Sequence, residues 1–241
     1  MELAEYYPPA KAQRVAHLGV KGMLALMRTE RGRRQYEQKI ENGCQVDDLH
    51  ALIADGRKFA VIYADPPWEF QACTGKSTWQ QTGARYYDAQ SLDVLKALPV
   101  KQLAAKDCAL FLWAVTAELP AALEVIKAWG FEYITVGFVW VKQNRSGDGL
   151  FTGLGAWTRA NAELCLLAKR GTPRRMAMDV HQVVMAPVGE HSVKPEEVRA
   201  RIERLVDGPY LEMFGRESVP GWTVYGNEIS REEWSHQCQV A

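Results

Sequence analysis

Short apolar runs and amphipathic stretches alternate along the chain from residue 59 onward. Apolar, partly β-branched runs of strand length lie at residues 59–64, 108–115, 133–142, 161–168, 180–186, 209–214 and 222–225. Apolar residues at helical spacing lie between them, at residues 91–98, 119–129 and 195–206. Alternation of this kind predicts an α/β fold, with a mixed, mostly parallel sheet that is flanked by helices.

The first part of the chain has a different character. Residues 10–42 have a helical pattern in which apolar positions stand among basic ones, and Gly19, Gly22 and Gly32 suggest breaks in it. We expect residues 1–45 to form an N-terminal helical extension that contacts the main domain, a partner subunit or a substrate.

Composition excludes some classes of protein. The 241 residues, with a mass of 27.1 kDa, fit one domain with a short extension. No apolar stretch approaches the roughly 20 residues of a membrane span, and the N-terminus lacks the pattern of a signal peptide. The five cysteines form no Cys-x-x-Cys pair and no zinc-like cluster, so we expect no metal site and a reducing, cytoplasmic location.

Charge is balanced overall but unevenly distributed. The formal net charge is zero, with 29 basic and 29 acidic residues. One basic cluster lies within residues 11–39, and the second consists of Lys169, Arg170, Arg174 and Arg175. Both are candidates for phosphate contacts, with a solvated surface as the simpler interpretation.

The apolar run of residues 59–64 ends in Asp65-Pro66-Pro67-Trp68. Two consecutive prolines lack N–H donors and fix φ, so the chain must leave the sheet at Asp65. A carboxylate then stands at the carboxyl end of a buried strand, which is the edge at which open α/β sheets bind ligands.

These four residues suit chemistry on an exocyclic amine. An adenine N6 amine is a poor nucleophile because its lone pair is delocalised into the ring. Asp65 and the rigid Pro66 carbonyl could both accept its hydrogens and draw the lone pair back onto nitrogen. Trp68, on the stiff segment after Pro67, could stack on a base taken out of its helix. The alternative is a turn that only ends the strand, with Trp68 in the core.

Further segments follow Asp65–Trp68 in a fixed order. They are Tyr86-Tyr87, Leu110–Trp113, Trp140–Lys142, Glu163–Leu166, Ser192–Glu197, Leu211–Arg216, Gly221-Trp222 and Gly226–Glu228. In this order they resemble the mRNA-adenosine-methyltransferase-like family of S-adenosylmethionine-dependent adenine N6-methyltransferases. That family includes the catalytic subunit of the eukaryotic mRNA enzyme and many bacterial and phage relatives, and the resemblance runs from about Val46 to Glu228.

The resemblance implies a Rossmann-like S-adenosylmethionine-dependent methyltransferase fold with a permuted motif order. The catalytic strand comes first and the cofactor-binding strand comes late, and residues 46–241 form the methyltransferase catalytic domain. The turn Phe214-Gly215-Arg216 after the late strand replaces a glycine-rich loop, and Gly215 would let the backbone approach the cofactor closely.

The resemblance also implies the residues that bind S-adenosylmethionine. Asp47 aligns with an acid beside the cofactor adenine, although it could be a helix-start or surface acid, and Asp48 competes for the role. Lys194 matches a lysine near the cofactor carboxylate, or is a charge at a helix entry. Arg216 matches an arginine at the ribose end, or forms a surface salt bridge. The full set is Asp47, Asp65, Lys194, Phe214, Gly215, Arg216, Asn227 and Glu228, of which the last two match positions beside the ribose hydroxyls.

The substrate-binding residues implied by the resemblance are Tyr86, Tyr87, Lys142, Arg159 and Glu163. The two tyrosines follow a long polar loop that suggests a mobile lid. Arg159 and Glu163 have the spacing of an Arg-x-x-x-Glu-like pair, which either forms an internal ion pair or helps to position the substrate base. The glycine-rich residues 143–157 suggest a second mobile loop.

We therefore expect an adenine N6-methyltransferase that takes its methyl group from S-adenosylmethionine and needs no metal. DNA is the favoured substrate because the chain is compact and lacks RNA-binding modules, with RNA as the alternative. A catalytically silent nucleic-acid-binding subunit, and an enzyme that methylates another amine, stay open as further alternatives. We also expect a homodimer, because one compact domain offers little surface for duplex DNA.

Overall fold

The structure is a computed structural model, and it describes residues 42–68, 90–153, 157–189 and 193–240, with single positions between residues 15 and 30. The helical extension predicted for residues 1–45 therefore falls mostly outside the described residues. The division of the chain at residue 46 stays a prediction.

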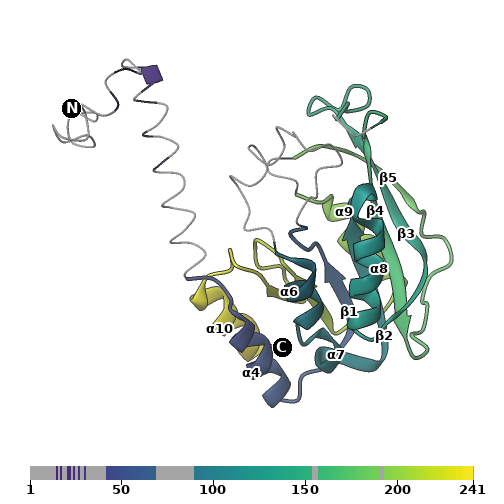
Figure 1. Cartoon of the computed structure of the whole chain (residues 1–241). Helices are drawn as coiled ribbons and strands as arrows, with labels where there is room; N and C mark the ends of the chain where they lie inside the picture. Colours follow the sequence, from purple (N-terminus) through teal and green to yellow (C-terminus); the bar gives the residue numbers. More distant parts are fainter. Residues whose placement is uncertain are drawn as a thin grey trace.

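The described residues form one seven-stranded sheet, with the strands in the order β5-β3-β4-β2-β1-β6-β7 (Figure 1). The strands are β1 (Phe59–Ala64), β2 (Ala104–Ala114), β3 (Glu132–Gln143), β4 (Ala162–Arg170), β5 (Val183–Pro187), β6 (Tyr210–Met213) and β7 (Trp222–Tyr225). All neighbours run parallel except β4, which is antiparallel to both β2 and β3. The predicted mixed, mostly parallel sheet is thus confirmed.

Each predicted strand is present, with small differences at the ends. β2 begins at Ala104 rather than at residue 108, because the exposed Lys106 and Asp107 interrupt its apolar pattern while the backbone already pairs Phe59 with Ala104. β5 begins at Val183 rather than at residue 180.

The helices cover the sheet and agree only in part with the sequence prediction. They are α4 (Val46–Ala54), α6 (Leu92–Ala97), α7 (Val100–Leu103), α8 (Leu119–Ala128), α9 (Glu196–Leu205) and α10 (Arg231–Val240). The predicted helices at residues 91–98, 119–129 and 195–206 are confirmed as α6, α8 and α9. No helix in the described part of the chain is both long and apolar enough to cross a membrane.

Sequence patterns missed α4, α7 and α10. α4 begins with a capping box, in which the Gln45 side chain accepts from the Asp48 backbone N–H and the Asp48 carboxylate accepts from the Gln45 backbone N–H. The serine or threonine that usually marks a helix start is replaced here by Gln45. α7 is a single turn. In α10, Trp234 is the buried hydrophobic residue, so the helix has too few apolar positions to show a periodic pattern.

The order of the strands is permuted in the sense that the sequence predicts. β1, the first strand of the described residues, lies in the interior of the sheet, and β6 comes late in the chain and pairs with it in parallel. Ala64 at the end of β1 lies opposite Met213 at the end of β6. Asp65 and Phe214 therefore leave the sheet side by side at its carboxyl edge.

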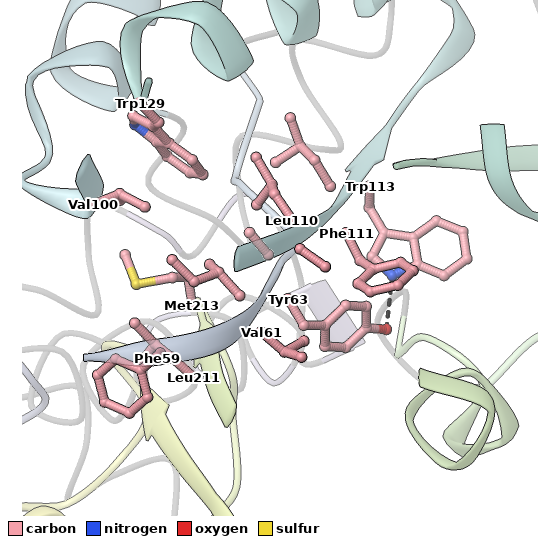
Figure 2. Close-up of a cluster of buried hydrophobic side chains, with 14 of the residues drawn as sticks. Phe59, Val61, Tyr63, Val100, Leu110, Phe111, Trp113, Trp129, Leu211 and Met213 are labelled. Atoms are coloured by element: carbon pink, nitrogen blue, oxygen red, sulfur yellow. Dashed lines mark hydrogen bonds between the residues drawn. The ribbon is translucent and has the colours of Figure 1, made fainter. Parts of the chain in front are cut away.

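The two faces of the sheet bury different side chains. Figure 2 shows Trp129 and Leu110 on one side of the strands and Tyr63 and Trp113 on the other. Trp129 follows α8 and donates through Nε1 to the Leu95 carbonyl of α6 over 2.8 Å, which joins these two helices over the first face. On the second face, Trp113 Nε1 donates to the Tyr63 hydroxyl over 2.7 Å.

A buried ion pair fastens α9 to the second face. Arg199 of α9 donates through Nε and Nη2 to the two carboxylate oxygens of Glu212, over 2.7 and 3.1 Å. Glu212 lies in β6, opposite Tyr63 of β1. Burial raises the pKa of the Glu212 carboxyl, while the guanidinium acts in the opposite direction. The end of α9 is held as well, because Trp222 Nε1 of β7 donates to Glu203 over 2.7 Å.

Substitution of Glu212 by alanine tests this attachment. The Glu212→Ala change leaves the Arg199 guanidinium without its carboxylate, so we expect a loss of about 3 kcal/mol in the free energy of unfolding, at the lower end of the range for breaking a buried pair. Urea denaturation measures it. The matched control is Asp179→Ala, which removes the partner of Arg204 on the same helix, where both side chains are more than half exposed and the effect should be small. Equal losses in the two variants would contradict the assignment.

Candidate functional site

The candidate site begins where β1 ends. The Asp65 backbone N–H still donates to the Met213 carbonyl over 3.3 Å, and the two prolines then take the chain out of the sheet. The Pro66 carbonyl accepts from the Trp68 N–H over 2.9 Å. A carbonyl oxygen has two lone pairs, so this turn leaves Pro66 able to accept one more hydrogen bond.

Asp65 shares a lysine with a second carboxylate. Lys194, just before α9, donates through Nζ to Asp65 Oδ2 over 2.6 Å and lies 3.4 Å from Glu163 Oε2. Glu163 reaches this edge because β4 is antiparallel and therefore starts where the other strands end. The site thus joins residues from three elements that lie far apart in the sequence.

Lys142, at the end of β3, completes the group. Its Nζ donates to Glu163 Oε1 over 2.5 Å. We call Asp65, Lys194, Glu163 and Lys142 the edge cluster, in which carboxylates and ammonium groups alternate. The structure thereby brings together four of the predicted site residues.

Arg159 has a different place from the one that its spacing suggested. Its side chain is exposed, and the ion pairs that the described residues provide for Glu163 come from Lys142 and Lys194. The internal Arg159–Glu163 ion pair is therefore wrong as an interpretation of this structure. A role of Arg159 in substrate binding stays a prediction.

Burial and charge act against each other in the edge cluster. Burial would raise the pKa of Glu163, but the ammonium groups of Lys194 and Lys142 outweigh it and hold that pKa below its ordinary value. Burial would lower the pKa of Lys194, but Asp65 and Glu163 outweigh it and raise that pKa. Burial raises the pKa of Asp65, although Lys194 acts in the opposite direction. Lys194 is thus protonated and Glu163 ionised at neutral pH.

Two tryptophans lie beneath the lysines of the edge cluster. Lys194 Nζ stands 5.5 Å from the ring centroid of Trp113, and Lys142 Nζ stands 5.0 Å from that of Trp140. The two indoles meet edge to face at 6.4 Å. These cation–π contacts hold the ammonium groups over an apolar floor. Neither tryptophan was predicted to have a role, although alternation along β2 and β3 places both on one face near the edge.

Trp68 is a buried residue in this structure. Its side chain is 7% exposed, and its Nε1 donates to the Trp113 carbonyl over 3.0 Å. This environment is that of the alternative interpretation, a tryptophan in the core. Stacking of Trp68 on a base stays a prediction, and it requires more of the indole to become accessible.

The turn after β6 is packed tightly against β7. Phe214 adopts a positive φ of 68°, a conformation that is uncommon for residues other than glycine. A Cβ atom on Gly215 would lie 2.2 Å from Val224 Cγ1, and one on Gly226 would lie 1.8 Å from the Gly215 carbonyl oxygen. Both glycines are therefore required by the contact between neighbouring strands, a reason that is independent of any ligand.

Charged side chains frame this turn. Arg216 Nε lies 3.6 Å from Glu228 Oε1, with both side chains partly exposed, and Asn227 is exposed beside them. Arg216 thus forms a salt bridge within the predicted cofactor site. Phe214, Gly215, Arg216, Asn227 and Glu228 all lie at the carboxyl ends of β6 and β7.

The start of α4 lies at the same end of β7. The Cys44 N–H donates to the Gly226 carbonyl over 3.2 Å, and Asp47 stands exposed in the first turn of the helix. Asp48 is engaged in the structure, because it accepts from the Gln45 N–H and from Arg231 Nη1, each over 2.6 Å. Among the residues that the structure describes, no side-chain partner is found for Asp47, and its role in cofactor binding stays a prediction.

Some predicted positions lie elsewhere. Tyr86 and Tyr87 fall outside the described residues. The basic cluster that includes Lys169 and Arg170 stands at the end of β4, at the edge of the sheet opposite Asp65. Arg170 Nη1 donates to the Lys101 carbonyl at the end of α7 over 2.7 Å, so its role in the structure is to cap a helix.

Comparison with known proteins assigns the family. The sequence profile of the MT-A70 family matches residues 59–228, which include the edge cluster and the turn after β6. The chain belongs to the MT-A70 family. It is a methyltransferase whose methyl donor is S-adenosylmethionine, as the resemblance of its motifs implied.

Individual relatives fall into two groups. The chain is 30% identical over 214 residues to the type II methyltransferase M.MunI of a Mycoplasma species, which covers 80% of this chain and 88% of that protein. It is 32% identical over 177 residues to the human N(6)-adenosine-methyltransferase catalytic subunit METTL3, which covers 71% of this chain and 28% of METTL3. A Drosophila melanogaster MT-A70-like N(6)-adenosine-methyltransferase matches to the same degree over 27% of its length. This MT-A70 chain thus spans little more than a quarter of its longer relatives.

The carboxyl edge has donor and acceptor groups that fit S-adenosylmethionine. The exposed Asp47 carboxylate can accept from an adenine amine, and Asn227 and Glu228 can bind ribose hydroxyls. The closely packed glycines leave backbone rather than side chain at the turn. The residues present therefore suit the cofactor that the family uses.

Glu163→Gln tests the charge state of the edge cluster. Because the two lysines lower the pKa of Glu163 in the folded state, its ionised form adds stability that is fully present above the unfolded pKa of about 4.3 and is lost as pH falls through the folded pKa. We expect the stability of the wild type relative to this variant, measured by urea denaturation, to fall between about pH 5 and pH 3. The control Glu124→Gln removes an exposed partner of Lys96 and should cost little stability at neutral pH. A pH-independent difference for Glu163→Gln would contradict the proposed stabilisation.

Proposed function

We propose that this MT-A70 chain methylates the N6 amine of adenine in DNA. The observation that carries the proposal is the Asp65 carboxylate, which stands at the carboxyl end of a central strand beside the Pro66 carbonyl and is held by Lys194. An exocyclic amine has two hydrogens, and two neighbouring hydrogen-bond acceptors can hold both of them at once.

The chain's own groups then act on the amine. Asp65 has two carboxylate oxygens with about four acceptor sites, so the hydrogen bond from Lys194 leaves capacity for the amine. The Pro66 carbonyl takes the second hydrogen, and both contacts localise the lone pair on nitrogen. Because burial raises the pKa of Asp65, the carboxylate is also suited to take the proton that the amine loses.

S-adenosylmethionine, when bound, supplies a methyl group on a sulfonium, which is already activated for displacement. We assign its binding to the carboxyl edge between α4, β6 and β7, through Asp47, the turn Phe214–Arg216, Asn227 and Glu228. Lys194 contacts Asp65, Glu163 and the Trp113 ring, on the side of β1 that faces β2 and β4, and there it orients Asp65. Positioning and electrostatics supply the acceleration under this assignment.

We prefer DNA to RNA on the extent of the similarity. The type II methyltransferase M.MunI matches 80% of this chain, a larger share than the 71% matched by METTL3 and by its Drosophila counterpart. The catalytically silent alternative is disfavoured because the complete edge cluster is assembled. We propose a homodimer in the cytoplasm, since one domain offers little surface for a duplex and Cys44, Cys108, Cys165 and Cys238 are free thiols.

Product analysis tests the function. The full chain is incubated with labelled S-adenosylmethionine and, in parallel, with duplex DNA, single-stranded DNA and RNA, and the nucleosides are identified by mass spectrometry. N6-methyladenine in DNA is the expected result. The same nucleoside in RNA alone would overturn the substrate class, and a different methylated product would overturn the reaction.

Asp65→Asn tests the acceptor role. Asparagine keeps the size of the side chain but has one acceptor oxygen and no charge, so we expect kcat to fall at least about a thousandfold, as for loss of a key preorganised electrostatic group. The Kd for S-adenosylmethionine, measured by calorimetry, should change by no more than a few-fold. Asp179→Asn, at an exposed position before β5 where the carboxylate pairs with Arg204 of α9, is the matched control and should leave kcat unchanged. Retained turnover in Asp65→Asn would contradict the assignment.

A further inference from the structure

Trp157 is the most exposed large hydrophobic residue in the described part of the chain. Its side chain is 99% exposed, ahead of Met178 at 88%. Burial of the large apolar surface of tryptophan in a contact is strongly favourable in free energy, and tryptophan is enriched at interfaces with other molecules. A fully exposed indole therefore indicates a contact with something other than this chain.

The arm that carries Trp157 rises directly from the edge cluster. It connects β3 to β4 through residues 144–161, of which the structure describes residues 144–153 and 157–161, and Figure 1 shows these described residues beyond the carboxyl end of β3. Its base is fixed by backbone hydrogen bonds from Lys142 to Asn161 over 2.8 Å and from Phe151 to Lys142 over 2.9 Å. Lys142 is the same residue whose side chain donates to Glu163.

The part of the arm that bears Trp157 is also held together internally. The Gly153 N–H donates to the Ala160 carbonyl over 2.9 Å, and a Cβ atom on Gly153 would lie 2.4 Å from that carbonyl oxygen. These residues flank Trp157 on both sides. The indole therefore extends from a segment whose base is held by backbone hydrogen bonds next to the edge cluster.

The charges on the arm favour an anionic partner. Arg145 and Arg159 are both exposed, and Asp148 is the acidic residue among the described positions of the arm. Exposed arginines attract the phosphates of nucleic acid, and an aromatic ring beside them can stack on any base because every base has a π-face. A second copy of this chain, whose net charge is zero, offers no comparable attraction to these arginines.

We propose that Trp157 is a nucleic-acid-binding residue, which stacks on a base outside the Asp65 site while Arg145 and Arg159 contact phosphates. This inference rests on the proposed function, because it assigns the arm to the same substrate. It gives the enzyme a second contact with the strand, in addition to the base whose amine is held at Asp65.

The test measures binding rather than catalysis. The full chain, without methyl donor, is titrated into fluorescein-labelled single-stranded and duplex DNA, and Kd is obtained from fluorescence anisotropy. Trp157→Ala is expected to raise Kd about tenfold, whereas Trp157→Phe, which keeps an aromatic face, should stay within about threefold of the wild type. Met178→Ala is the matched control, because it removes an exposed apolar side chain away from the arm, and it should leave Kd unchanged.

Salt dependence separates the arginines from the indole. Arg159→Ala should reduce the slope of log K against log salt by about 0.7 to 0.9, the value for one lost phosphate contact, and Trp157→Ala should leave this slope nearly unchanged. An unaltered slope in Arg159→Ala would overturn the phosphate contact.

Two outcomes would overturn the inference about Trp157 while leaving the proposed function intact. One is wild-type DNA affinity in Trp157→Ala. The other is a change from dimer to monomer in Trp157→Ala, seen by sedimentation, with unchanged DNA affinity per chain, which would assign Trp157 to a second copy. Failure of the wild type itself to bind DNA or RNA would instead overturn the proposed substrate class and this inference together.

Discussion

The ammonium group of Lys194 is the point on which the site depends, because two carboxylates from different strands share it. Asp65 follows β1 and Glu163 belongs to β4, and without a cation between them their like charges would repel in a buried place. The lysine permits both acids to stay at the same edge. It also holds the Asp65 carboxylate in place at the end of β1, as the proposed acceptor role requires. Positioning of this kind is what catalysis by orientation requires.

Two features of the fold place Lys194 next to both carboxylates. The antiparallel direction of β4 brings Glu163 to the edge where the other strands end. The ion pair of Arg199 with Glu212 fastens α9 beneath the same edge, two strand residues before the turn at Phe214. One helix, together with the residue just before it, therefore connects Asp65, through Lys194, with the strand that carries the candidate cofactor turn. A rotation of α9 would disturb both regions together.

Much of the fold could be predicted from the sequence, because the apolar runs of the strands are short and well separated, and those of β1 and β2 are mostly buried. The turn at Asp65 could also be predicted, because two prolines after an apolar run leave the backbone few conformations. The helix α4 was not, because it begins at Gln45 without the usual serine or threonine cap, and α10 was not, because it has few apolar residues. The pairing of Glu163 with Lys142 and Lys194 depends on the direction of β4, which periodicity does not reveal, so the sequence spacing instead suggested Arg159 as its partner. The burial of Trp68 against Trp113 is likewise a tertiary contact.

The most direct test of the account is a crystal structure of the chain bound to S-adenosylmethionine or its demethylated product. The account predicts density for the cofactor at the carboxyl ends of β1, β6 and β7, in contact with the turn Phe214–Arg216 and adjacent to Asp65, with Lys194 still on the Asp65 carboxylate. Cofactor bound at another edge of the sheet, or a Lys194 that has left Asp65 altogether, would contradict the claim that this lysine organises the site.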